Sequence, residues 1–509
     1  MNATLSLASI LAEPARRRPG HVALIEGERR LTFAELWRAA REQAGALIER
    51  GIRPGDRVAL MCPNTADFPL AYYAILAAGA TVVPVHLLLT ADEAEFVLRD
   101  SGATLLICHP QVESVGAEAA RRVGIACVRP DGLTGEAIAL FVPRSPLDTA
   151  VVFYTSGTTG RPKGAELSHL NMVMCATVNA FDANDVHRDD VALGALPLFH
   201  VFGQTVSMNS TWRVGATLVL MPRFTAPEAI RLMVTERVNT FHGVPTMYHG
   251  LIEAAAGAAE LPALRLCISG GAALPLPVLE RFEEVFDARI LEGYGLSETS
   301  PTAAVNQPVF GPRAGTVGHP VWGVDVEIAD PGVTDRIELL PTGSVGEVVV
   351  RGHNVFSGYT GNPEASARAV VDGWFRTGDL GVRDEQGYLR IVDRIKEMII
   401  RGGFNVYPTE VEEALLRHPR IAQVAVIGVP DENYGEEIVA VVVPAGELSA
   451  EEVVAYGREH VARYKYPRRV EFVSELPLGP THKVLKRELK QRFMCAAGAT
   501  PRQHGRDRT

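Results

Sequence analysis

Short apolar, β-rich runs alternate with Ala-, Glu- and Arg-rich stretches through the first two-thirds of this 509-residue chain. The clearest apolar runs cover residues 57–62, 104–109, 150–155 and 216–221, and the clearest helical stretches cover 33–50 and 226–237. Strands that alternate with helices in this way form βαβ units, in which helices cover the faces of a parallel sheet. The alternation therefore predicts an α/β fold with largely parallel sheets.

The pattern changes twice toward the C-terminus. Between about residues 310 and 395, turn residues separate short strand-like runs, which predicts a smaller β-rich subdomain. After Arg394 an α+β rhythm follows, with an expected helix over 449–464 whose N-cap is Ser449. A chain of this length has more than one core, at roughly 100–200 residues per domain. We therefore expect a large N-terminal domain over residues 1–393 and a small, mobile C-terminal domain over residues 394–509.

Composition and charge exclude several classes of protein. Apolar residues make up 47% and charged residues 22%, as in an average globular protein, which excludes a disordered chain. The net charge of −10 argues against a nucleic-acid partner. The six cysteines include no C-x-x-C pair, which favours a reducing, cytoplasmic location. The most apolar run, 68–84, contains prolines and a glycine and predicts a buried helix and strand rather than an integral membrane segment.

Residues 154–164 read YTSGTTGRPKG and directly follow a strand-like run. Glycines let a backbone approach phosphate oxygens, hydroxyls and amides donate hydrogen bonds, and Lys163 adds positive charge. The segment is not a Walker A loop, because Pro162 precedes the lysine and Gly164 follows it. The string resembles the phosphate-binding signature of the acyl-adenylate-forming (ANL) superfamily. That superfamily includes acyl-CoA synthetases, adenylation domains of non-ribosomal peptide synthetases and firefly-type luciferases.

Further segments resemble motifs of the same superfamily, in the same order and at similar spacings. They are PLFHVFG (197–203), SGGAALP (269–275), GYGLSETSP (293–301), FRTGDLG (375–381), DRIKEMIIRGGFNVYPTEVE (393–412) and LPLGPTHKVLKREL (476–489). Each segment alone has an ordinary structural explanation. Their joint occurrence by chance is not credible, and the resemblance extends over nearly the whole chain.

The segment GYGLSETSP is the most specific of these. In the superfamily its tyrosine, here Tyr294, stacks on adenine, its serine, Ser297, faces the phosphates, and its glutamate, Glu298, holds Mg²⁺. A carboxylate is a hard oxygen ligand of the kind that Mg²⁺ prefers. The resemblance also implies that Thr155 is the second protein contact to the metal and that His200 lies beside the acyl pocket.

The C-terminal segments carry the remaining roles that the resemblance implies. Asp379 is expected to accept hydrogen bonds from the ribose hydroxyls, and Arg394 to contact the ribose or a phosphate. Lys396 marks the hinge between the domains, and the pair 402–403 (Gly-Gly) lies where the superfamily threads the pantetheine arm of coenzyme A. Lys483 corresponds to the catalytic lysine.

The expected site thus has three parts. Catalytic roles fall to Lys483, Glu298 and His200, and the metal contacts to Thr155 and Glu298. The residues expected to bind ATP or coenzyme A are Thr155, Ser156, Gly157, Thr158, Thr159, Gly160, Lys163, Gly271, Ala272, Tyr294, Gly295, Ser297, Asp379, Arg394, Lys396, Gly402 and Gly403.

One residue departs from the pattern of the superfamily, which usually has a glycine immediately before the catalytic lysine. This chain has His482 there. Because glycine adopts positive φ more readily than histidine does, we expect a different geometry for this loop.

The resemblance implies an AMP-forming acid–thiol ligase that uses ATP, Mg²⁺ and coenzyme A. An amino acid substrate would need a carboxylate near its ammonium, and residues 197–212 contain no Asp or Glu. A dicarboxylate such as malonate would need a cation, and residues 239–252 contain no Arg or Lys. The apolar residues of these segments favour a medium- or long-chain fatty acid, whereas His242 and Tyr248 leave an aromatic acid open.

Other functions stay open at this stage. One alternative is a fatty acyl-AMP ligase that loads a separate carrier protein, and another is an aryl- or malonyl-type CoA ligase. A third, from a different class, is a nucleotide- or acyl-binding protein with weak catalysis. The expected partners are small molecules, namely the acid, ATP and coenzyme A, and the sequence leaves a homodimer open.

Overall fold

The computed structural model describes residues 3–155, 161–431, 433–479 and 484–494. The chain forms two compact units. The first consists of Met1–Leu274, Val278–Thr377 and Val382–Arg390, and the second of Pro275–Pro277, Gly378–Gly381 and Ile391–Thr509. The functional division expected from the sequence, into an acyl- and AMP-binding domain and a mobile catalytic-lysine domain, stays a prediction.

A nine-stranded sheet in the first unit has the order β15-β14-β13-β12-β11-β9-β10-β1-β2. All neighbouring pairs from β1 through β10, β9, β11 and β12 to β13 are parallel, and β2, β14 and β15 add antiparallel edges. The strands are β1 (Val22–Glu26), β2 (Arg29–Thr32), β9 (Val191–Gly194), β10 (Thr217–Leu220), β11 (Thr240–Gly243), β12 (Leu266–Ser269), β13 (Ile290–Gly295), β14 (Thr302–Val305) and β15 (His319–Pro320).

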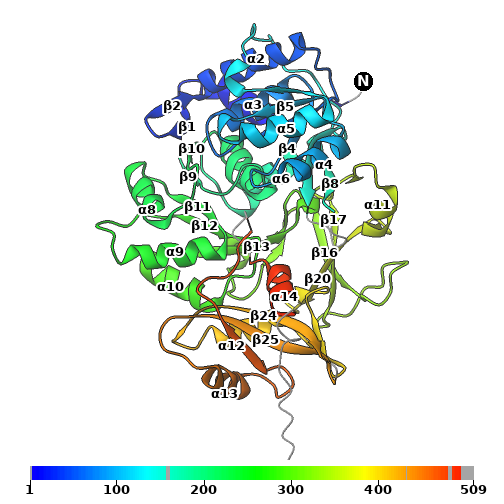
Figure 1. Cartoon of the computed structure of the whole chain (residues 1–509). Coiled ribbons are helices and arrows are strands. Elements are labelled where there is room, and N and C mark those ends of the chain that lie inside the picture. Colours follow the sequence, from blue (N-terminus) through cyan, green and yellow to red (C-terminus); the bar gives the residue numbers. More distant parts are fainter. Residues whose placement is uncertain (1–2, 156–160, 432, 480–483, 495–509) are drawn as a thin grey trace, which may run out of the picture. The chain divides into compact units, whose positions relative to one another are not determined.

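Helices α8 (Ala226–Thr235), α9 (Pro245–Ala255) and α10 (Leu276–Phe286) lie beside β11 and β12 (Figure 1). Their apolar side chains form one core cluster with Phe241 and Cys267 from those strands. A π-helix, η4 (Phe202–Asn209), contacts β9 and β11. Short π-helical segments are rare and are frequent at functional sites.

A seven-stranded sheet in the first unit has the order β18-β8-β7-β4-β3-β5-β6. Its strands are β3 (Arg57–Met61), β4 (Thr81–Pro84), β5 (Leu105–Cys108), β6 (Ala126–Val128), β7 (Thr149–Thr155), β8 (Lys163–Ser168) and β18 (Gly358–Tyr359). Strands β3 to β7 pair in parallel, whereas β7, β8 and β18 are antiparallel. The accompanying helices are α1 (Ser9–Arg17), α2 (Phe33–Glu49), α3 (Asp67–Ala77), α4 (Ala91–Ser101), α5 (Glu113–Val123), α6 (His169–Val178) and α7 (Ser210–Val214).

The apolar run 68–84 forms α3 and then β4, and ten of the eleven residues of α3 are buried. The sequence-based expectation of a buried helix and strand is therefore confirmed. Among the described residues, no helix combines the length and the apolar character that spanning a membrane requires.

The β-rich part follows, with a sheet in the order β16-β17-β20-β19. Its strands are β16 (Val324–Ala329), β17 (Gly346–Gly352), β19 (Val370–Val371) and β20 (Trp374–Arg383). In the sequence, helix α11 (Pro363–Ala369) precedes β19, and strand β21 (Leu389–Arg394) follows β20. The division between the two units falls within β20 and β21.

The second unit has a sheet in the order β23-β22-β25-β24, and β26 pairs with β25. The elements are β22 (Ile399–Arg401), β23 (Phe404–Val406), α12 (Pro408–Leu415), β24 (Ile421–Asp431), β25 (Gly435–Pro444), α13 (Ala450–His460), β26 (Arg469–Phe472) and α14 (Lys486–Met494). Helices α12 and α13 pack on one face of the sheet and α14 on the other (Figure 1). As expected, Ser449 caps α13 by accepting a hydrogen bond from the Glu452 amide at 3.2 Å. The mixed α/β architecture is confirmed.

Candidate functional site

The Glu298 carboxylate marks the point where several sequence motifs meet. It lies in the short helix η5 (Ser297–Thr299), just after β13, and is 7% exposed. Its Oε1 atom accepts hydrogen bonds from the Tyr359 hydroxyl at 2.9 Å and the Thr155 hydroxyl at 3.4 Å. Its Oε2 atom accepts none from the residues that the structure describes. The described residues therefore hold the carboxylate through Oε1.

Tyr359 belongs to none of the motifs found in the sequence. Its strand β18 pairs with β8, opposite Ala165, and its ring contacts Phe356 at 4.8 Å between centroids. Burial and the nearby Glu298 carboxylate raise the pKa of the Tyr359 hydroxyl. The hydroxyl therefore stays protonated and donates to Glu298. It was missed because 61 residues separate the two and only strand pairing brings them together.

Lys163 opens β8, directly opposite Thr155 on β7. Its ammonium lies 5.1 Å from the centre of the Tyr359 ring. A cation over an aromatic face is attracted to the ring electrons. Thr155, Lys163, Glu298 and Tyr359 thus form one continuous cluster, which we call the Glu298 cluster.

The strand before Glu298 approaches a neighbouring backbone closely. A Cβ atom at Gly295 would lie 1.7 Å from the carbonyl oxygen of Pro301, so only glycine fits there. Tyr294 and Ser297, on either side of it in the sequence, are both partly buried. Three of the predicted nucleotide contacts therefore lie in the turn that presents Glu298.

The glycine-rich segment after β12 and the aromatic segment at 197–203 contact each other. A Cβ at Gly270 would be 3.3 Å from the Phe202 ring. Gly271 has a φ of +85°, and it and Ala272 are exposed. His200, partly buried, accepts a hydrogen bond at Nδ1 from the Phe202 amide at 3.3 Å.

The second unit brings together another group of predicted residues. The Arg394 guanidinium lies 3.3 Å from the Asp379 carboxylate, which is almost fully buried. Desolvation and the positive charge of Arg394 lower the pKa of Lys396. Gly402 and Gly403 form the turn between β22 and β23 with φ values of +57° and +82°, which favour glycine.

The other predicted residues lie outside the described part of the chain. They are Ser156, Gly157, Thr158, Thr159, Gly160 and Lys483, together with His482.

The described residues contain no group of three or more His, Cys, Asp or Glu side chains that could hold a metal ion. The protein instead offers the Oε2 atom of Glu298 with the Thr155 hydroxyl nearby. Hard oxygen donors in small number fit Mg²⁺, which is usually bound by one or two carboxylates with water and substrate phosphates. The donor set is therefore suited to a magnesium ion that arrives with a phosphate-bearing substrate.

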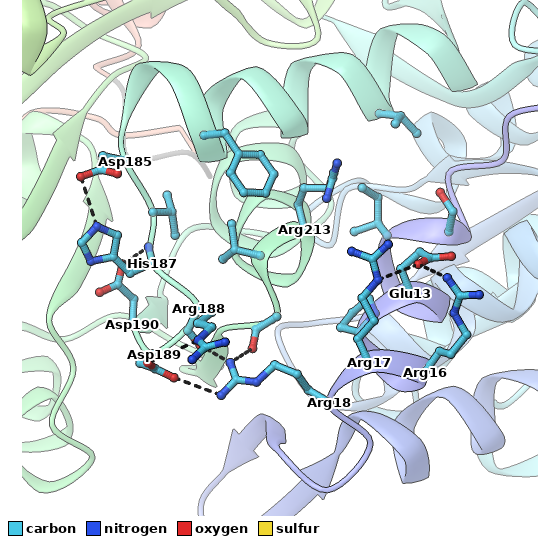
Figure 2. Close-up of a pocket in the computed structure, with 18 of the residues that line it drawn as sticks. Glu13, Arg16, Arg17, Arg18, Asp185, His187, Arg188, Asp189, Asp190 and Arg213 are labelled. Atoms are coloured by element: carbon cyan, nitrogen blue, oxygen red, sulfur yellow. Dashed lines mark hydrogen bonds and ion pairs between the residues drawn. The ribbon is translucent and has the colours of Figure 1, made fainter.

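A cavity of about 1200 Å³ lies elsewhere in the first unit, beside α1. Figure 2 shows that its charged side chains pair with one another. Arg18 lies 3.0 Å from Asp189, and Glu13 lies 2.7 Å from Arg16 and 3.2 Å from Arg17. None of the site residues predicted from the sequence lines this cavity, so it is distinct from the Glu298 cluster.

Comparison with known proteins gives the family. Residues 11–360 match the model of the AMP-binding enzyme family, and residues 410–483 match that of the AMP-binding enzyme C-terminal domain. The chain is 39% identical to a feruloyl-CoA synthase from an Amycolatopsis species, over 94% of this chain and 97% of that protein. It is 34% identical to a long-chain-fatty-acid–CoA ligase of Bacillus subtilis, over 95% and 94%.

Solved structures agree with these matches. ATP-bound MatB from Rhodopseudomonas palustris superposes with a TM-score of 0.88 at 32% identity, covering 97% of this chain and 99% of that one. The anthranilate CoA ligase AuaEII in complex with anthranoyl-AMP gives 0.90 at 27% identity, covering 98% and 99%. The chain therefore belongs to the AMP-binding enzyme family and is an AMP-forming acid–thiol ligase that uses ATP, Mg²⁺ and coenzyme A.

Proposed function

We propose that this protein converts a carboxylic acid with a largely apolar, uncharged body into its coenzyme A thioester, by way of an acyl-adenylate. The observation that carries the proposal is the Glu298 cluster. Among the described residues, only hydroxyl groups donate to this buried carboxylate, and they do so at Oε1. Localisation in the cytoplasm and a homodimer stay predictions from the sequence.

The first half-reaction forms the acyl-adenylate. A carboxylate oxygen of the acid attacks the α-phosphorus of ATP, and the bond from that phosphorus to the bridging oxygen breaks, releasing pyrophosphate. Such transfers depend on positioning and charge neutralisation more than on covalent help.

The Glu298 cluster supplies part of this positioning. Glu298 and Thr155 would hold Mg²⁺, which when bound offsets negative charge on the phosphates. Tyr359 keeps the Glu298 carboxylate in one orientation by donating to Oε1. Lys163 adds a positive charge beside the strand end that precedes the phosphate loop. Lys483 is assigned to the acid carboxylate and the α-phosphate from the sequence.

The second half-reaction forms the thioester. The thiol sulfur of coenzyme A attacks the acyl carbon, the bond from that carbon to the AMP oxygen breaks, and the thiol proton leaves to solvent. The turn at Gly402–Gly403 is suited to a narrow substrate arm, because two consecutive residues without side chains have positive φ.

The uncharged segments that are predicted to lie beside the acyl chain favour an apolar acid. The segment 197–212 has no acidic residue, and Val201, Met208 and Val244 near the carboxyl ends of β9 and β11 are buried and apolar. Fatty and aryl acids both satisfy this condition. The relatives include a feruloyl-CoA synthase and a long-chain-fatty-acid–CoA ligase, so both classes belong in the first substrate panel.

The direct test is acid-dependent pyrophosphate exchange over a panel of fatty, aryl and dicarboxylic acids, with consumption of coenzyme A measured in parallel. We expect exchange with apolar acids and matching thioester formation. Exchange without thioester formation, combined with acylation of a carrier protein, would favour the acyl-AMP ligase alternative. Absence of exchange with every acid would refute the proposal and leave a nucleotide- or acyl-binding protein.

The variant Lys483→Ala separates the half-reactions. We expect it to abolish adenylation and to leave transfer from synthetic acyl-AMP to coenzyme A largely intact. Lys490→Ala is the matched control, because Lys490 lies nearby in the sequence and forms no ion pair with a described residue. Equal loss of both half-reactions in Lys483→Ala would contradict the assignment.

A further inference from the structure

His242 is a buried side chain with an unpartnered polar atom among the described residues. It lies near the end of β11, is 1% exposed, and its Nδ1 atom has no partner among the described residues. Buried polar groups are almost always hydrogen-bonded, so an exception points to a functional requirement.

The direction of the side chain follows from the sheet. Phe241 and the paired Cys267 belong to the apolar cluster with α8, α9 and α10. Successive side chains of a strand point to opposite faces. His242 and its partner Ile268 therefore lie on the other face from those helices. The π-helix η4 contacts β11 but contributes no fully buried residue to that cluster.

Two more buried polar atoms without a described partner lie on η4. They are Oε1 of Gln204 and Oγ of Ser207, and both side chains are fully buried. Three buried polar atoms on two elements in contact with each other thus have no partner among the described residues. One such atom could be a packing defect, whereas three on adjoining elements suggest a shared requirement for a polar ligand.

His242 lies at the edge of the sheet where a substrate is expected to bind. β11, β12 and β13 are parallel neighbours and end at Gly243, Ser269 and Gly295. Glu298 follows the end of β13 by three residues. Ligands of open α/β sheets bind beyond the carboxyl ends of the strands. His242, the penultimate residue of β11, therefore lies at the edge of the sheet from which Glu298 also extends.

The charge of His242 limits what it can bind. Burial lowers the pKa of the imidazole to about 4, so it is neutral at physiological pH. A neutral imidazole has one donor and one acceptor nitrogen. A neutral imidazole does not offset the charge of a second carboxylate on the substrate. An unsubstituted alkyl chain, in turn, offers the imidazole no hydrogen bond. A neutral hydroxyl, ether or carbonyl group satisfies it.

We propose that His242, Gln204 and Ser207 form a polar wall of the acyl pocket and that the preferred acid carries a neutral oxygen substituent on its apolar body. The substrate class is then an oxygenated acid, such as a hydroxyaryl or keto acid, rather than a plain fatty acid. The inference rests on the proposed function, because it takes acid activation as given and concerns only which acid is preferred.

The test compares matched acids that differ by one oxygen substituent. The probes are cinnamate with its 2-, 3- and 4-hydroxy derivatives, and octanoate with its hydroxy and keto derivatives. We expect at least one oxygenated member to exceed its parent by about ten- to hundredfold in kcat/KM, since a pocket built to hydrogen-bond a substrate group discriminates against the analogue without it. Equal values for parent and derivatives throughout would overturn the inference, while exchange with any acid would leave the proposed function intact.

Variants then assign the preference to residues. His242→Leu should remove most of it by lowering kcat/KM for the oxygenated acid while leaving the parent acid unchanged or improved. Ser207→Ala, which removes one oxygen at little cost in volume, should reduce the preference more weakly. His249→Leu is the control, because His249 lies on α9 and pairs with Glu253. If both His242→Leu and Ser207→Ala kept the native ratio of kcat/KM between the oxygenated acid and its parent, the assignment would be refuted. Buried water would then be the partner of these polar atoms.

Discussion

Two glutamates, the buried Glu298 in the first unit and the partly buried Glu412 in the second, have different kinds of partner. From the part of the chain that the structure describes, the Glu298 carboxylate receives hydrogen bonds only from hydroxyl groups, at one oxygen. Glu412 on α12 in the second unit accepts at Oε1 from the Lys486 ammonium at 2.7 Å and from the Val426 amide at 2.6 Å. A carboxylate paired with an ammonium has its charge compensated within the protein. A carboxylate held by neutral hydroxyls keeps its charge for a cation from outside.

The side chains of Glu412 and Lys486 are each 17% exposed. Burial works against the charge on Lys486, but Glu412 and Glu397 at 3.8 Å raise its pKa. Lys486 joins α14 to α12, which lie on opposite faces of the sheet. We therefore predict a structural role for Glu412 and a functional role for Glu298. The following changes would separate the two roles.

The largest expected effect on stability is in the second unit. Lys486→Met leaves Glu412 buried without its cation, and removing one partner of a buried pair costs about 3–5 kcal/mol. We expect a loss of that size in the free energy of unfolding, measured on the full chain by chemical denaturation. Lys490→Met is the matched control and should change it by less than about 0.5 kcal/mol. Similar free energies of unfolding for the two variants would contradict the structural role assigned to Glu412.

The corresponding change in the first unit should affect activity. Glu298→Gln keeps the shape and the hydroxyl contacts but removes the charge, and we expect pyrophosphate exchange to fall by about 100- to 1000-fold, as for other single electrostatic contributions. Stability should change little. An unfolding midpoint that falls with activity would mean that Glu298, like Glu412, mainly supports the fold.

The first unit should also respond to acid. Burial lowers the pKa values of His86, His169 and His242 to about 4 each. Between pH 6.5 and 4 the unfolded chain binds more protons than the folded chain, so stability is complete above about pH 6.5 and is lost as the pH falls through this window. For the fully buried His242 the loss is about 3 kcal/mol. Denaturation at several pH values gives the free energy of unfolding as a function of pH. Between pH 6.5 and 4 its slope should be smaller for His242→Leu than for the native chain. Identical slopes would contradict the lowered pKa of His242.

The smallest expected effect is that of changing Tyr359. This tyrosine donates a hydrogen bond to Glu298, whereas the partner of Glu412 is an ammonium group. Tyr359→Phe keeps the ring beside Lys163 and removes only the hydroxyl that donates to Glu298. Partners that orient a metal ligand contribute about 10- to 100-fold in metal affinity. We expect the Mg²⁺ concentration for half-maximal activity to rise by about tenfold, with kcat at saturating Mg²⁺ largely kept.

The control for this change is Tyr388→Phe, since the Tyr388 hydroxyl donates to backbone carbonyls of Phe310 and Gly311. It should leave the Mg²⁺ dependence unchanged. An equal shift in both tyrosine variants would point to a general loss of packing rather than to the orientation of Glu298.

Local signals predicted several of the elements. The helix and strand within residues 68–84, the cap at Ser449 and the parallel pairing of the central strands all follow from period, capping chemistry and alternation. The motifs also located Glu298 and Thr155, which the structure brings within 3.4 Å. Tyr359 carried no comparable signal, because it is one residue of a two-residue strand far from any motif.

The sequence by itself determined the fold class, the order of the elements and the chemistry of the motifs, because these depend on residues close together along the chain. Tertiary structure alone decided which carboxylate is compensated by Lys486 and which is left to a cation, and which buried imidazole lacks a partner. Those outcomes depend on strand pairing and helix packing between distant segments, which set the environment of a charge. The sequence does not distinguish a glutamate with a compensating cation from one without, because that difference depends on its neighbours in space.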